Sequence, residues 1–136
     1  MIGRSRWRTS RGRAPNLGSA TVEMVLLVPA MMLIFFVIIQ FALWAHAAQV
    51  TQLAASEGDR VARSQGGGAV AGIAQAEAVT REPDSGLANA AVNAEMLPGD
   101  VVRVTVSGSA VSIIPGLTLP VSAAQSGPIQ EFRESG

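Results

Sequence analysis

Apolar residues are concentrated in one long run near the start of the chain. Residues 24–44 form an uncharged stretch of twenty-one residues. A helix rises about 1.5 Å per residue, so this stretch is long enough to cross a hydrocarbon layer of roughly 30 Å. Pro29 removes one backbone donor inside the run, a defect that neighbouring helices can repair in a membrane. Trp44 falls where an aromatic anchor at the membrane surface is expected, so the pattern predicts one membrane-spanning helix.

The helical pattern continues beyond Trp44. Apolar residues recur at spacings of three or four residues or their multiples, while polar residues occupy the other faces. The apolar positions are Ala47, Val50, Ala54 and Val61. This pattern predicts an amphipathic stalk that ends near Arg63, before three glycines at 66–68 that favour a turn.

The remaining residues predict a small domain. An alanine-rich stretch from residue 69 to about 81 predicts a second helix, ended by the proline-containing turn 82–86. Alternating apolar residues on either side of Pro98 and Gly99 predict a hairpin, which we favour over a helix spanning 87–97. A third strand is expected near residues 117–123, after the apolar loop 113–116, and the tail from Gln125 is expected to be loose.

Together these elements predict an α+β fold. A long transmembrane and stalk helix would carry a small domain with a short helix and an antiparallel sheet of about three strands. The expected organisation is a leader at 1–18, the long helix at 19–65 and the small domain at 66–136.

Charge is divided along the chain, although the formal net charge is zero. The first twenty-two residues hold five arginines and no acid, whereas the rest hold ten acids and five arginines. The leader arginines are Arg4, Arg6, Arg8, Arg11 and Arg13. Basic residues beside a membrane helix stay on the cytoplasmic side, so we expect a single-pass protein whose C-terminal domain is extracytoplasmic. A nucleic-acid-binding arm is the alternative interpretation of this cluster.

Glu23 is the one charged residue between positions 22 and 48. A charge carried to the bilayer centre costs roughly 2.5–3.5 kcal/mol, so such a group usually has a partner. Glu23 lies five residues after Gly18 and directly before the apolar run. This spacing points to the region around Gly18 for the partner of Glu23.

Residues 18–29 resemble the N-terminal motif of the TadE-like family, the small pilin-like proteins of Tad (tight adherence) pilus systems. Pro29 and the alanine- and arginine-containing stretch 54–63 extend the resemblance. It implies that a prepilin peptidase cuts after Gly18, so that Ser19 becomes the first mature residue and Glu23 the fifth. Ser19 differs from the aromatic first residue common in type IV pilins.

The resemblance also implies function by assembly in a bacterial cell membrane. The partners it implies are the bilayer, a prepilin peptidase, other pilin-like subunits, and an assembly platform with its ATPase, with no nucleic acid and no small-molecule substrate. Cleavage would create a positive amine on Ser19, which Glu23 of a neighbouring subunit could neutralise while both leave the water. Gly18 and Ser19 would then form the processing site, and Glu23 and Pro29 would serve assembly.

Two other classes of protein share features of this sequence. The small-x-small sequence Ala45-His46-Ala47 has the form that signal peptidase cuts, so a secreted or merely signal-anchored binding protein is the alternative. The apolar run is longer than the usual 7 to 15 residues of a signal sequence and has an acid at its start. An enzyme is not expected, because the acids of the C-terminal part resemble solvated surface and the single histidine, His46, has no cysteine or second histidine to share a metal. We expect no catalytic centre, cofactor or metal.

Overall fold

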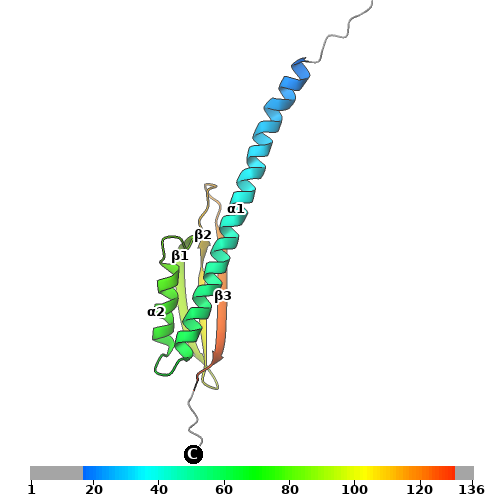
Figure 1. Ribbon diagram of the computed structural model, residues 1–136. Helices are drawn as coiled ribbons and strands as arrows, with labels where there is room; N and C mark the ends of the chain where they lie inside the picture. The colour runs from blue at the N-terminus through cyan, green and yellow to red at the C-terminus, as the bar shows by residue number, and fades with distance from the viewer. Residues whose placement is uncertain (1–16, 131–136) are drawn as a thin grey trace, which may run out of the picture. The chain divides into compact units, whose positions relative to one another are not determined.

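The computed structural model describes residues 17–130. Helix α1 spans Leu17–Arg63 and helix α2 spans Ala69–Thr80, followed by strands β1 (Leu87–Leu97), β2 (Val101–Ala110) and β3 (Leu119–Pro128) (Figure 1). The predicted α+β class is therefore confirmed. The chain divides into two compact units at Ile34 and Phe35, within α1, so the second unit contains the C-terminal part of this helix. Residues 1–16, which hold the leader arginines, lie outside the described residues.

Helix α1 ends where the sequence predicts. Gly66 and Gly68 have φ of 78° and 88°, a left-handed backbone that residues with a side chain adopt at a cost. The Gly68 N–H donates to the Ala62 carbonyl at 3.0 Å, which satisfies one of the last carbonyls of the helix. The chain then reverses into α2, whose predicted range is also confirmed.

The three strands form one antiparallel sheet in the order β1-β2-β3. Leu97 pairs with Val101 across the Pro98–Asp100 turn, so the favoured hairpin is confirmed over the helical alternative. The register shifts between Ala88 and Ala91, where two residues stand opposite Gly108. A Cβ at Gly108 would lie 3.2 Å from the Ala88 carbonyl oxygen, so the bulge requires a small residue there.

The third strand differs from its prediction. It starts at Leu119 and continues through residues 125–128, which pair in register with residues 104–101 of β2. The expectation of a loose tail from Gln125 was therefore wrong for these residues. Their polar composition did not show that β2 offers a row of backbone donors and acceptors to an edge strand. Ile129 continues the attachment, since its N–H donates to the Asp100 carbonyl at 2.9 Å.

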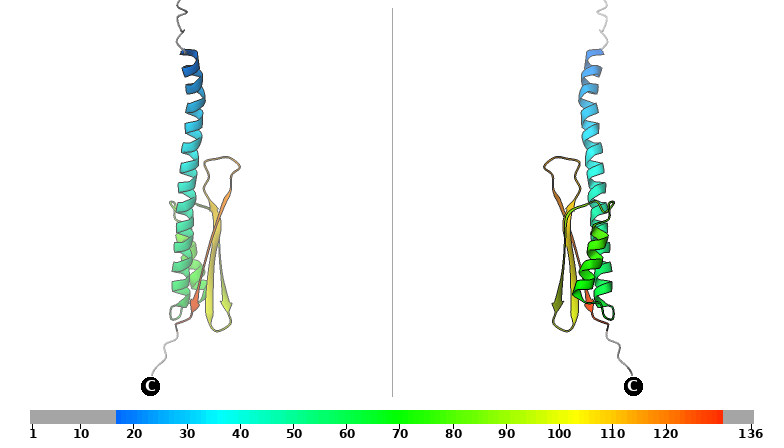
Figure 2. Two further views of the ribbon diagram at one scale, coloured as in Figure 1. Left: turned by 90° about the vertical axis from the view of Figure 1, so that its right-hand side faces the viewer. Right: turned by 90° about the vertical axis from the view of Figure 1, so that its left-hand side faces the viewer.

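In the second unit, both helices cover the same face of the sheet (Figure 2). The centre of the core is formed by Val102, Val104 and Val106 of β2, all fully buried. Small side chains of the helices pack on them: Ala54, Ala55, Ala62 and Ala76. A layer of small residues lets the helices approach the sheet closely.

Helices α1 and α2 approach each other closely at two glycines. A Cβ at Gly58 would lie 2.8 Å from the Gly72 carbonyl oxygen, and a Cβ at Gly72 would lie 2.7 Å from the Ala62 Cβ. Neither glycine can be enlarged without moving a helix. The stalk prediction was partly right: Ala47 and Ala54 are fully buried, whereas Val50 and Val61 are half-buried.

Candidate functional site

The predicted processing and assembly residues lie along the first turns of α1. Gly18 and Ser19 follow the first residue of the helix, and Glu23 and Pro29 lie one and three turns further on. All four are exposed, and the helix continues through Pro29. The leader arginines precede the described residues, so their placement stays a prediction.

Ser19 and Glu23 are four residues apart and therefore lie on the same face of α1. Helical side chains lean toward the N-terminus, so the Glu23 carboxylate is directed toward the turn that contains Ser19. An amine freed at Ser19 would thus lie within reach of Glu23 in its own chain. Such a pairing would neutralise two charges before they enter an apolar environment.

The apolar part of α1 carries large side chains that the chain itself does not bury. Every residue from Gly18 to Ile38 is exposed, including Leu33 at 67% and Phe35 at 62%. The helix is long and apolar enough to cross a membrane. A helix that is apolar on all faces needs lipid or other apolar helices around it.

The cleavage site of the signal-peptidase alternative, after Ala47, lies in a different part of α1. Ala47 is fully buried against Ala110 and Val121 of the sheet. His46 is exposed, and its Nε2–H donates to the Asp84 carbonyl at 2.8 Å, which joins α1 to the α2–β1 turn. A cut after Ala47 would therefore break a helix in the middle of its packing surface.

A further site was missed by the sequence analysis. Gln40 is only 4% exposed and holds the loop between β2 and β3, residues 111–118. Its Oε1 accepts hydrogen bonds from the Ile113 N–H at 3.0 Å and the Ser112 hydroxyl at 3.1 Å, and its Nε2 lies 3.4 Å from the Val111 carbonyl oxygen. The sequence does contain a feature that could have indicated this site, because Gln40 is the one polar residue within the apolar run 24–44.

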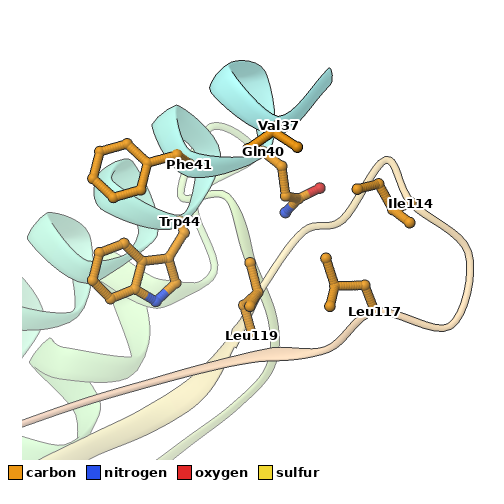
Figure 3. Close-up of a pocket in the computed structure, with 7 residues that line it drawn as sticks. All are labelled: Val37, Gln40, Phe41, Trp44, Ile114, Leu117 and Leu119. Atoms are coloured by element: carbon orange, nitrogen blue, oxygen red, sulfur yellow. The ribbon is translucent and has the colours of Figure 1, made fainter. Parts of the chain in front are cut away.

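An open apolar pocket lies beside this contact, between the helix and the loop (Figure 3). The pocket has a volume of about 320 Å³. The Gln40 side chain extends from the helix toward the loop. Its walls come from one helix face and from the loop with the start of β3. The lining residues are Val37, Gln40, Phe41, Trp44, Ile114, Leu117 and Leu119.

The acids of the small domain lie where solvated groups are expected. Within residues 17–130 no group of three or more His, Cys, Asp or Glu side chains is gathered that could hold a metal ion. Glu77 pairs with Arg81 at 2.7 Å and Glu95 with Arg103 at 3.3 Å on the surface. These contacts are those of exposed ion pairs.

The buried ion pair is on α1. Asp59 Oδ2 lies 2.9 Å from Arg63 Nε, but this contact is not aligned as a hydrogen bond, and among the described residues Asp59 Oδ1 has no hydrogen-bond partner. The Asp59 side chain is 8% exposed and that of Arg63 is 30% exposed. The pair lies beside β3, since a Cβ at Gly127 would meet the Arg63 side chain at 2.9 Å.

A protein-family model matches the N-terminal part of the chain. The model of the family described as TadE-like protein matches residues 18–60. This confirms the resemblance found in the N-terminal motif, and the match covers the apolar part of α1 and most of its stalk. No curated protein and no solved structure matches the chain. The TadE-like segment and the long apolar helix fit a membrane-anchored, pilin-like protein associated with the Tad pilus.

Proposed function

We propose that this chain, whose residues 18–60 are TadE-like, is a minor pilin or pseudopilin of a bacterial Tad-type pilus or secretion system. It acts through helix–helix assembly and not through catalysis. The observation that carries the proposal is the match over 18–60 together with a helix whose large apolar side chains are exposed on all faces. Such a surface is suited to transfer from lipid to a bundle of similar helices.

The proposed sequence of events starts with insertion. The leader arginines keep the N-terminus in the cytoplasm, which places the α2 and sheet domain on the other side. A prepilin peptidase then cuts between Gly18 and Ser19, near the start of α1. The new Ser19 amine and Glu23 neutralise each other, between subunits or within one, as the helix packs laterally with other pilin-like helices.

The first test is the mature N-terminus. The protein is purified from its native membrane, in a strain with a working prepilin peptidase, and its mass is measured. We expect a chain that begins at Ser19. A chain that begins at Ala48 would support secretion, and an uncut chain would support a plain membrane anchor; both results contradict the proposal.

The second test concerns the pairing. Glu23→Gln removes the charge but keeps the size of the side chain, so it should spare insertion and strongly reduce incorporation into pili or pilin complexes. Glu57→Gln is the matched control, because Glu57 lies on the stalk and pairs with exposed Arg60 at 2.7 Å. Co-purification with other pilin subunits is the readout. Normal incorporation of the Glu23 variant would reject the pairing step even if cleavage at Ser19 occurs.

A further inference from the structure

We propose that the β2–β3 loop, residues 111–118, inserts into the lipid bilayer, in the leaflet on the side of the small domain. The loop would then be a second membrane contact, and the acyl chains of that leaflet would fill the pocket beside Gln40. This inference requires α1 to be embedded in a bilayer. It does not depend on cleavage after Gly18.

The side chains of the loop are those of a membrane-contacting segment. Val111, Ile113, Ile114 and Leu117 are all exposed, at 36% to 45%. They surround Pro115 and Gly116, so the loop offers apolar side chains with no charge among them. Exposed apolar residues gathered in one loop indicate a contact surface.

The backbone of the loop is prepared for an environment without water. A non-helical segment is costly in lipid because its N–H and C=O groups lack partners. Here the Ile113 N–H donates to Gln40, the Ile114 N–H to the Ser112 hydroxyl, and the Leu117 N–H to the Ile114 carbonyl. The loop can therefore lie among apolar groups without leaving these donors unsatisfied.

The contact with Gln40 determines how deep the loop lies in the bilayer. Gln40 lies four residues before Trp44, which corresponds to about 6 Å along the helix axis. Trp44 is the expected interfacial anchor, so the loop is bound on the membrane side of that anchor. The pocket wall made by Val37, Phe41 and Trp44 belongs to the apolar surface of the spanning helix, and lipid that covers this surface continues into the pocket.

The distribution of charged residues along the sheet also favours insertion of the loop. Residues 104–130 contain no charged side chain, and this range includes the whole loop. The charged residues of the hairpin, Glu95, Asp100 and Arg103, lie near the β1–β2 turn at the opposite end of β2. Burying residues 111–118 in lipid therefore desolvates no charged side chain. The charged turn at this end of the sheet, with Glu82 and Asp84, is bound to His46, which lies beyond Trp44 on the side of the small domain.

The test uses the absence of cysteine from the chain. Single variants of the full-length protein, Ile114→Cys and Leu117→Cys, are spin-labelled and reconstituted in phosphatidylcholine–phosphatidylglycerol vesicles. Collision with oxygen, which concentrates in lipid, is compared with collision with a water-soluble nickel chelate. Leu33→Cys serves as the lipid reference. Met96→Cys is the matched control, because Met96 is an exposed apolar residue near the other end of the sheet.

We expect labels at 114 and 117 to give an oxygen-to-nickel ratio several-fold above that at 96 and close to that at 33. A ratio at 114 and 117 equal to that at 96 overturns the proposal. Labels shielded from both reagents overturn it as well, because a second protein copy then covers the loop. If the label at 33 also reports water, membrane anchorage itself fails, and with it the proposed function.

A second variant tests the part assigned to Gln40. Gln40→Leu removes the acceptor for Ile113 and Ser112 but keeps the helix apolar. In this background we expect the ratio at 114 to fall several-fold, because the freed amide favours water, while the ratio at 33 stays constant. An unchanged ratio at 114 would show that the loop is inserted without help from Gln40 and would overturn that assignment.

Discussion

Helix α1 contains two segments that follow opposite packing rules. From Gly18 to Ile38 every residue is exposed, and most side chains are large and apolar. From Ala47 to Ala62 most buried positions hold small residues, among them Ala47, Ala54, Gly58 and Ala62. The first segment is built for a surrounding that comes from outside the chain, and the second for partners within the chain.

The difference shows how one helix can be adapted to two environments. One segment is covered by apolar groups from outside the chain, and the other is packed in the core of the small domain. Large side chains increase the apolar area that lipid or other helices cover, whereas small side chains let α2 and the sheet approach the helix backbone. The hydrophobic effect stabilises both segments, but the second also depends on shape. Substitutions should therefore affect the two segments differently.

The largest expected effect is on membrane insertion. Leu33→Arg places a charge in the exposed apolar segment and should disfavour insertion by roughly 2.5–3.5 kcal/mol. Leu53→Arg makes the same change at a 52% exposed position of the stalk and should leave insertion unchanged. Carbonate extraction of membranes measures the inserted fraction. Equal extraction of the two variants would contradict the division of α1.

The next effect is on the fold of the small domain. Gly58→Val should destabilise it by about 3 kcal/mol, because the added atoms meet the Gly72 carbonyl oxygen, Ala76 and Val104 at 2.8–3.1 Å. The matched control is Ser56→Val, at an exposed position two residues earlier. Urea unfolding in detergent measures the change. Insertion of the Gly58 variant should be normal, and an unchanged unfolding midpoint would disprove the close crossing of α1 and α2.

A smaller effect is expected in the core of the sheet. Val104→Ala should lower the free energy of unfolding by about 2 kcal/mol, because Val104 is fully buried between helices and sheet. Val70→Ala removes the same atoms from an 82% exposed side chain of α2 and should change stability by less than about 0.5 kcal/mol. Similar losses in both variants would mean that the core lies elsewhere.

The smallest effect concerns the ion pairs of the stalk. Asp59→Ala should lower the free energy of unfolding by about 1 kcal/mol. The effect is modest because one oxygen of the buried carboxylate has no hydrogen-bond partner among the described residues, and because Arg63 can still reach water once Asp59 is removed. Glu57→Ala, at the exposed Arg60 pair, should cost about 0.5 kcal/mol or less. Thermal unfolding of the two variants gives the difference. A larger loss for Glu57 than for Asp59 would reverse our ranking of the pairs.

Much of the architecture could be predicted from local patterns. The apolar run, the glycines at 66–68 and the alternation on both sides of Pro98 predicted the long helix, its end and the hairpin. These features depend on residues close together in sequence, where hydrophobic period and backbone preference act directly. The TadE-like motif was also local, since the residues that carry the resemblance, 18–29 and 54–63, lie on one continuous helix.

Contacts between distant residues could not be predicted in this way. The strand at 125–128 forms because β2 presents free backbone groups to it, although its own residues are polar. Gly58 and Gly72 meet through a helix crossing, and Gln40 meets Ser112 across seventy-two positions of sequence. The sequence by itself determined which segment is stable only in an apolar environment and where the helices end. Tertiary structure alone decided which small or polar residues become buried, because burial depends on which surface the rest of the chain brings to them.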